Sequence, residues 1–117
     1  EHDFAAFCRR PPDRPDGPLT RRVLAARWSL LRGPGLDGEV LRFEIEALAF
    51  CHQMVRSIVG LLVAIGRGRA RPSDVAERLA SGLRLGNPAV APPQGLCLAA
   101  VDYPEPWGVL ARPPGMR

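Results

Sequence analysis

The sequence predicts an α+β domain in which two helices pack on one face of an antiparallel or mixed sheet. Two runs of residues alternate between apolar and polar side chains, and a turn-rich segment separates them. Two later segments carry apolar residues at helical spacing, and a further apolar run follows them. This order of elements is typical of a two-layer α+β fold. We expect one domain over residues 1–104 and an irregular tail over residues 105–117.

The first half of the chain predicts a short helical turn followed by a hairpin. Phe4 and Phe7 lie three apart, as in one helical turn, and a proline-rich loop follows. Residues 20–31 and residues 41–47 form the alternating runs, and glycines and a proline fill the turn between them. The apolar side chains expected on one face are Leu24, Ala26, Trp28, Leu30, Leu41, Phe43, Ile45 and Ala47. The polar side chains between them indicate half-buried strands.

The second half predicts two helices and a closing strand. Apolar residues recur three and four apart from His52 to Ile65, and Gly66 ends this helix. Ser73 is a suitable N-cap for a second helix from Asp74 to Ala80. An apolar run from Gly95 to Tyr103 is expected to return to the sheet as the last strand.

The composition is that of an ordinary globular protein with an unusual basic side. Hydrophobic residues make up 46% and charged residues 24% of the 117 residues, and all 16 cationic residues are Arg. Coding by a GC-rich genome explains most of this arginine usage, although the guanidinium fork also suits phosphate. The net charge of +4 and the pI near 9.8 permit contact with nucleic acid but do not require it.

The cysteines predict neither a metal site nor a disulfide framework. Cys8, Cys51 and Cys97 are far apart, odd in number and flanked by apolar residues. We expect three free thiols that serve as small hydrophobic side chains in a reducing, cytoplasmic setting. Residues 1–3 show no signal peptide, and the most apolar stretch, Ile58–Ile65, is too short to cross a bilayer, so no membrane partner is expected.

Arg56 is the residue that the helical pattern does not explain. It interrupts an apolar helix about one turn from the N-terminus, where the helix dipole disfavours a cation. A buried guanidinium is costly without an anion. Arg56 should therefore reach solvent, pair with Glu44 or Glu46, or meet a specific anion elsewhere.

The segment around Arg56 resembles the C-terminal motif of the tRNA pseudouridine synthase A family. The matching residues run from Ala49 to Gly60, reading Ala-Phe-Cys-His-Gln-Met-Val-Arg-Ser-Ile-Val-Gly, and are followed by Gly66-Arg67-Gly68. Upstream, His2-Asp3-Phe4 with Phe7-Cys8, then Thr20-Arg21, are similar to the preceding motif of that family. Residues 91–98, reading Ala-Pro-Pro-Gln-Gly-Leu-Cys-Leu, and residues 101–104 are similar to its closing strand. The three motifs cover nearly the whole chain in the family order.

The resemblance implies the C-terminal domain of a tRNA pseudouridine synthase, with a ferredoxin-like α+β fold. It implies that Arg56 pairs with the catalytic aspartate and orients it. Leu96 would line the uracil pocket, or would be an ordinary strand-core leucine. His52 would face RNA, or would simply be exposed at the start of the helix. The family implies tRNA as substrate, a homodimer, and no metal or organic cofactor.

Clustered arginines are the candidates for contact with RNA phosphates. One group lies in and after the proline-rich loop, and a second group follows the first helix. The first group consists of Arg9, Arg10, Arg14, Arg21 and Arg22, and the second of Arg67, Arg69 and Arg71. Either group could instead be a solvated surface loop, and this alternative is stronger for the second.

One family feature has no match in the sequence. The family carries its catalytic aspartate in an Arg-Thr-Asp motif of the N-terminal half, and these three residues do not occur together here. Asp3, Asp13, Asp16 and Asp102 lie outside such a motif. At the family's Asp-Arg pair the chain has Leu83-Arg84, so only Arg84 matches. The expectation is a synthase domain acting on the anticodon stem-loop that needs a missing N-terminal half and is inactive alone. The alternatives are an inactive RNA-binding or dimerisation module and an unrelated α+β domain.

Overall fold

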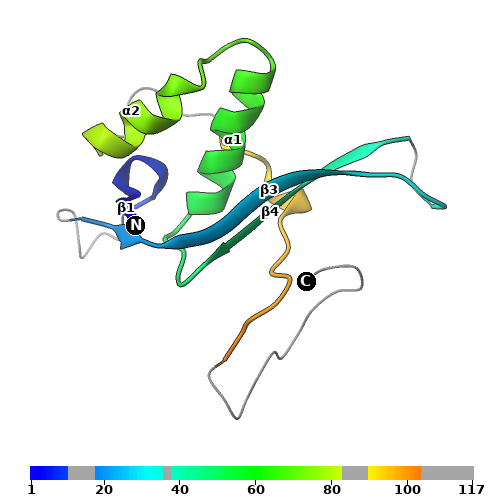
Figure 1. Ribbon diagram of the computed structural model, residues 1–117, viewed down its shortest axis with the longest axis horizontal. Helices are drawn as coiled ribbons and strands as arrows, with labels where there is room; N and C mark the ends of the chain where they lie inside the picture. The colour runs from blue at the N-terminus through cyan, green and yellow to red at the C-terminus, as the bar shows by residue number, and fades with distance from the viewer. Residues whose placement is uncertain (11–17, 36–37, 83–89, 104–117) are drawn as a thin grey trace.

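The computed structural model describes residues 1–10, 18–35, 38–82 and 90–103. Figure 1 shows two helices and the N-terminal segment gathered at one end, with a long hairpin extending away from them. In chain order the elements are β1 (His2–Asp3), η1 (Ala5–Phe7), β2 (Thr20–Arg21), β3 (Val23–Leu31), β4 (Val40–Ala47), α1 (Met54–Gly66), α2 (Ser73–Ser81) and η2 (Pro93–Gly95). The predicted α+β class is confirmed. The expected tail over residues 105–117 lies outside the described residues.

The predicted hairpin is confirmed in its pairing and in its faces. β3 pairs with β4 in antiparallel register, which places Leu30 opposite Leu41 and Trp28 opposite Phe43. The Trp28 and Phe43 rings lie 4.9 Å apart between centroids, a cross-strand aromatic contact. Arg27 pairs with Glu44 on the opposite, charged face. One face of the hairpin is therefore wholly apolar along the paired region.

The single strand expected over residues 20–31 is divided in two. Residues 20–21 form β2, which pairs with β1 in a second two-stranded antiparallel sheet. Arg22 follows, and β3 begins at Val23 with a register irregularity before Ala25. The division allows the same run to join the N-terminal segment at one end and the long hairpin at the other.

The core lies where η1 meets the two helices, as the blue turn between α1 and α2 shows in Figure 1. The side chains of Phe7 and Met54 are fully buried. The other buried apolar residues are Phe4, Ala5, Ala6, Cys8 and Leu61. The predicted apolar stripe of α1 is confirmed, because Ile58 and Ile65 pack against this cluster beside Met54 and Leu61.

The hairpin contributes little to this core. Of its residues, only Val23 packs against the core cluster in the described part of the chain. Trp28 is 43% exposed and Leu41 is 66% exposed, so the apolar face of the hairpin remains largely open to solvent.

The helix boundaries differ slightly from the expected ones for identifiable reasons. Gln53 adopts a left-handed backbone with φ of 63°, so α1 begins at Met54 and not at His52. Pro72 precedes the first residue of α2, and Ser73 lies inside the helix without a capping hydrogen bond. Asp74 instead joins the first turn to the residue before Pro72, because its Oδ2 accepts a hydrogen bond from the Arg71 N–H at 3.0 Å.

The predicted last strand is wrong. Residues 93–95 form a single 3₁₀ turn, and the described residues from 96 to 103 contain one isolated bridge at Asp102 but no strand. Leu98 is 76% exposed. The segment has the composition of a strand, yet among the described residues it joins neither two-stranded sheet, although each strand of these sheets has only one neighbour.

Candidate functional site

Arg56 is joined to a segment 35 residues further along the chain. Its Nε donates a hydrogen bond to the Ala91 carbonyl oxygen at 2.6 Å, and the Ala91 N–H donates to the Arg56 carbonyl at 3.0 Å. The side chain is half-buried in the first turns of α1. These two hydrogen bonds fix the position of residue 91 against the helix, and they fix the direction of the guanidinium plane.

The carboxylates of the hairpin are not the anion partner of Arg56. Glu44 pairs with Arg27 at 3.4 Å and with Arg42 at 2.9 Å, so the Glu44 alternative is wrong. Among the described residues Arg56 makes no ion pair, and its hydrogen bond to Ala91 uses only Nε. The two terminal nitrogens thus keep the geometry in which arginine binds a carboxylate with two parallel hydrogen bonds.

Leu96 follows η2, five residues after the contact with Arg56. The turn is closed by a hydrogen bond from the Leu96 N–H to the Pro93 carbonyl at 3.1 Å. Leu96 is 52% exposed and belongs to no strand, so the alternative of a strand-core leucine is wrong. The side chain is an open apolar surface on a segment that Ala91 ties to α1.

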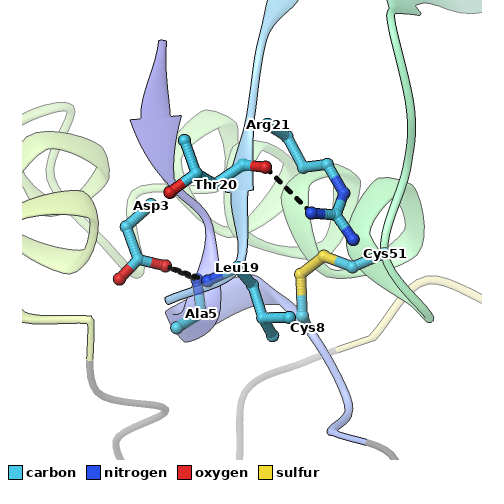
Figure 2. The surroundings of a disulfide bond; sticks show 7 residues. All are labelled: Asp3, Ala5, Cys8, Leu19, Thr20, Arg21 and Cys51. Atoms are coloured by element: carbon cyan, nitrogen blue, oxygen red, sulfur yellow. Dashed lines mark hydrogen bonds between the residues drawn. A yellow bond between two sulfur atoms is a disulfide. The ribbon is translucent and has the colours of Figure 1, made fainter. Parts of the chain in front are cut away.

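A disulfide between Cys8 and Cys51 lies at the base of α1 (Figure 2). The two Cα atoms are 5.7 Å apart, which is the usual separation for such a bond. The expectation of three free thiols is therefore wrong, and Cys97 is the free cysteine in the described part of the chain. Composition and spacing could not reveal this pair, because the two residues lie 43 positions apart in sequence.

Several predicted RNA-facing residues come together around this bond. The Arg9 N–H donates to the His52 carbonyl at 2.8 Å, which places the start of the proline-rich loop beside the start of α1. His52 and Arg9 are exposed, and Arg10 is half-buried. Arg21 lies near the disulfide in Figure 2, and its Nη1 donates to the Thr20 carbonyl at 2.8 Å. Arg14 lies outside the described residues.

The second arginine group is partly engaged in local contacts. Arg71 pairs with Asp74 at 3.5 Å and with Glu77 at 3.7 Å on α2. Arg67 and Arg69 are exposed in the connection between the helices. The contacts of Arg71 with Asp74 and Glu77 therefore give it a structural role at the start of α2.

The alternative interpretation of Asp3 as part of a loop or cap is confirmed, and two further features of this region were not expected from sequence. Asp3 accepts hydrogen bonds at one oxygen from the Ala5 N–H at 3.0 Å and the Leu19 N–H at 2.9 Å, which explains this carboxylate as a structural tie. Ser57 is buried, and its hydroxyl has no partner among the described residues. Ala91 has no side-chain functional group, so no sequence pattern could have indicated its contacts with Arg56. For Asp3 the signal was its place before a helical turn.

The described residues contain no helix of the length and hydropathy needed to cross a membrane. They also contain no group of three potential metal-ligating side chains.

Comparison with known proteins identifies one protein family whose members are similar to this chain. A family model described as tRNA pseudouridine synthase matches residues 1–104. The chain is 49% identical over 115 residues to a tRNA pseudouridine synthase A of Solidesulfovibrio magneticus, covering 97% of this chain and 39% of that protein. It is 46% identical over 112 residues to one of Frankia casuarinae, covering 96% and 38%. The chain therefore spans about two fifths of the length of these curated relatives.

Proposed function

The chain belongs to the tRNA pseudouridine synthase family, and we propose that it is the C-terminal domain of an enzyme that isomerises uridine to pseudouridine in the anticodon stem-loop of tRNA. The observation that carries the proposal is the state of Arg56. It is half-buried, oriented by Ala91, and without an anion among the described residues. A site of this kind is complete only when a carboxylate arrives from elsewhere.

The reaction explains why such a carboxylate is required. The bond from ribose to N1 of uracil breaks, the base turns over, and a new bond joins the ribose to C5. A carboxylate attacks or moves a proton during these steps, while the base is held out of its stack. In our proposal the terminal nitrogens of Arg56 hold an aspartate from the N-terminal half, and Leu96 forms an apolar wall of the uracil pocket.

The open face of the hairpin supports a protein partner in the same enzyme. A contiguous apolar surface of this kind is seldom left bare on a soluble protein. Its paired residues are Ala26, Trp28, Leu30, Leu41, Phe43 and Ile45. We assign this face to a contact with the N-terminal half of the enzyme. We further propose that the whole enzyme acts in the cytoplasm. We also propose that it forms a homodimer.

The first test concerns Arg56 in the longer protein that contains this chain. An Arg56→Lys variant should lose at least ~100-fold in the rate of tritium release from tRNA labelled at uridine C5, because lysine cannot bind a carboxylate with a planar fork. Arg32→Lys is the matched control, since Arg32 is exposed, pairs with Glu39 on the hairpin and belongs to neither arginine group. Equal rates for Arg56→Lys and the unaltered protein would refute the assigned role.

The second test concerns the arginines at the base of α1. Reversing the charge of Arg9 and Arg10 should weaken tRNA binding by about tenfold and reduce its salt dependence. Each phosphate contact that is lost lowers the number of counterions released when the tRNA binds. Arg32→Glu is the control, because Arg32 is exposed and pairs with Glu39 at the far end of the hairpin. Affinity that falls equally in both variants would show only a general charge effect.

A second candidate function is an RNA-binding or dimerisation module without catalysis. The observation that favours it is the missing Arg-Thr-Asp segment in this sequence. The residues that precede Glu1 in the gene product discriminate between the two. An Arg-Thr-Asp segment there supports the enzyme, and its absence supports the module.

A further inference from the structure

The Cys8–Cys51 pair connects two segments that carry predicted RNA-facing residues. Cys8 ends the N-terminal turn and immediately precedes Arg9, while Cys51 immediately precedes His52 at the start of α1. We propose that this pair is a reversible thiol–disulfide site, exchanged by a low-molecular-weight thiol, whose state determines how firmly the segment after Cys8 is held to the start of α1.

The burial of the two cysteines gives the exchange a direction. Cys8 is only 2% exposed and belongs to the core cluster, whereas Cys51 is partly exposed at its edge. An attacking thiolate therefore reaches the Cys51 sulfur. Its attack forms a mixed disulfide at Cys51 and releases the Cys8 sulfur as a thiolate, which takes up a proton.

A second molecule of the small thiol completes the reduction. Its thiolate attacks the external sulfur of the mixed disulfide, releases the Cys51 thiolate and forms the small-molecule disulfide. Two electrons pass from two small thiols to the protein disulfide. Glutathione disulfide reverses both steps and restores the bond.

The consequence of the exchange depends on what else holds the two segments together. Beside the disulfide, a main-chain hydrogen bond joins them, from the Arg9 N–H to the His52 carbonyl at 2.8 Å. The Met54 N–H donates to the Cys51 carbonyl at 3.0 Å, so Cys51 also takes part in starting α1. When the disulfide is reduced, this Arg9–His52 hydrogen bond loses the covalent constraint beside it and opens more often.

The chain contains internal references for both parts of the proposal. Cys97 is exposed and free, so its mixed disulfide with glutathione reports the reaction of a single thiol in the same buffers. The Leu48 N–H donates to the Arg22 carbonyl at 3.1 Å at the base of the hairpin, so it reports opening elsewhere in the fold.

The test uses the 117-residue chain equilibrated in buffers with different ratios of glutathione to glutathione disulfide. Alkylation under denaturing conditions followed by mass spectrometry should leave Cys8 and Cys51 unmodified at the oxidised end and modify both at the reduced end, with glutathionylation of the exposed Cys97 counted separately. The same samples should show exchange of the Arg9 amide hydrogen accelerated at least ~10-fold by reduction, with the Leu48 amide unchanged. The thermal midpoint should fall by roughly 10 °C or more on reduction.

Variants separate the bond from other effects of the thiols. Cys51→Ala should show fast Arg9 exchange in both buffers, and Cys97→Ser should behave as the unaltered chain. Alkylation of both Cys8 and Cys51 in every buffer would overturn the proposal, and so would Arg9 exchange that does not depend on the buffer. None of these measurements involves RNA, so the result stands apart from that of the proposed synthase function.

Discussion

At the scale of single residues, the molecule is organised by two side chains whose partners lie far away in sequence. Arg56 is oriented by the backbone of Ala91, and Cys8 is bonded to Cys51. The sequence identified Arg56 as unusual but not its partner, and it contained no sign that Cys8 and Cys51 are bonded. A helical pattern shows that an arginine is out of place, but a backbone carbonyl 35 residues away has no signature in the sequence.

Gln53 gives a residue-scale prediction of stability. Its φ of 63° lies in the left-handed region, where branching at Cβ increases steric strain. Gln53→Val should lower the free energy of unfolding by about 1–2 kcal/mol, whereas Gln53→Asn should change it by less than about 0.5 kcal/mol. Urea denaturation of the two variants measures the difference. If the valine variant is as stable as the asparagine variant, residue 53 does not hold this conformation in solution.

At the scale of elements, local contacts set where each helix and strand begins. The left-handed Gln53 starts α1, and the hydrogen bond from the Arg71 N–H to Asp74 starts α2. The hairpin register follows from the alternation of side chains, because a shift by one residue would place Trp28 and Phe43 on opposite faces of the hairpin.

The start of α2 gives a prediction at this scale. Asp74→Ala removes the hydrogen bond from the Arg71 N–H at 3.0 Å and the ion pair with the Arg71 side chain. It should lower the free energy of unfolding by about 1 kcal/mol. Ser73→Ala should cost less than about 0.5 kcal/mol, because Ser73 makes no capping hydrogen bond. Thermal unfolding compares the two variants. A larger loss for Ser73→Ala would restore serine as the cap of this helix.

The same local rules show how far the sequence could predict the fold. Periodicity predicted the hairpin faces and the buried stripe of α1, because both depend on neighbours along the chain. It could not show that residues 96–103 form no strand, since joining a sheet depends on the arrangement of distant segments and not on composition alone. Arg56 was identified by its misplaced charge, whereas its contact with Ala91 and the Cys8–Cys51 pair required the three-dimensional arrangement.

At the scale of the whole molecule, the chain has a core at one end and an uncovered hairpin at the other. The core joins η1 to both helices, while Trp28 and Leu41 remain exposed. The chain also spans only about two fifths of its curated relatives. Both facts support the proposal that a further half of the enzyme completes the structure and supplies the catalytic carboxylate.

This proposal predicts the behaviour of the chain in isolation. The 117-residue chain should release no tritium from tRNA labelled at uridine C5, because the proposal places the aspartate that pairs with Arg56 in a further N-terminal half. Adding a separately produced N-terminal half should restore release, and Trp28→Asp should weaken this restoration by placing a charge on the open hairpin face. Conversion of uridine by the chain alone would contradict the proposal.

The closure of the chain at the base of the hairpin has a practical consequence. The Leu48 N–H donates to the Arg22 carbonyl at 3.1 Å, and the Cys8–Cys51 bond encloses residues 9–50, which contain β2, β3 and β4. The two ends of this arm, residues 9–50, therefore meet beside α1, whatever the length of the connection between Leu31 and Val40. A peptide tag or fluorophore inserted between Leu31 and Val40 should leave the core unchanged, so the arm offers a place for a probe that reports on assembly.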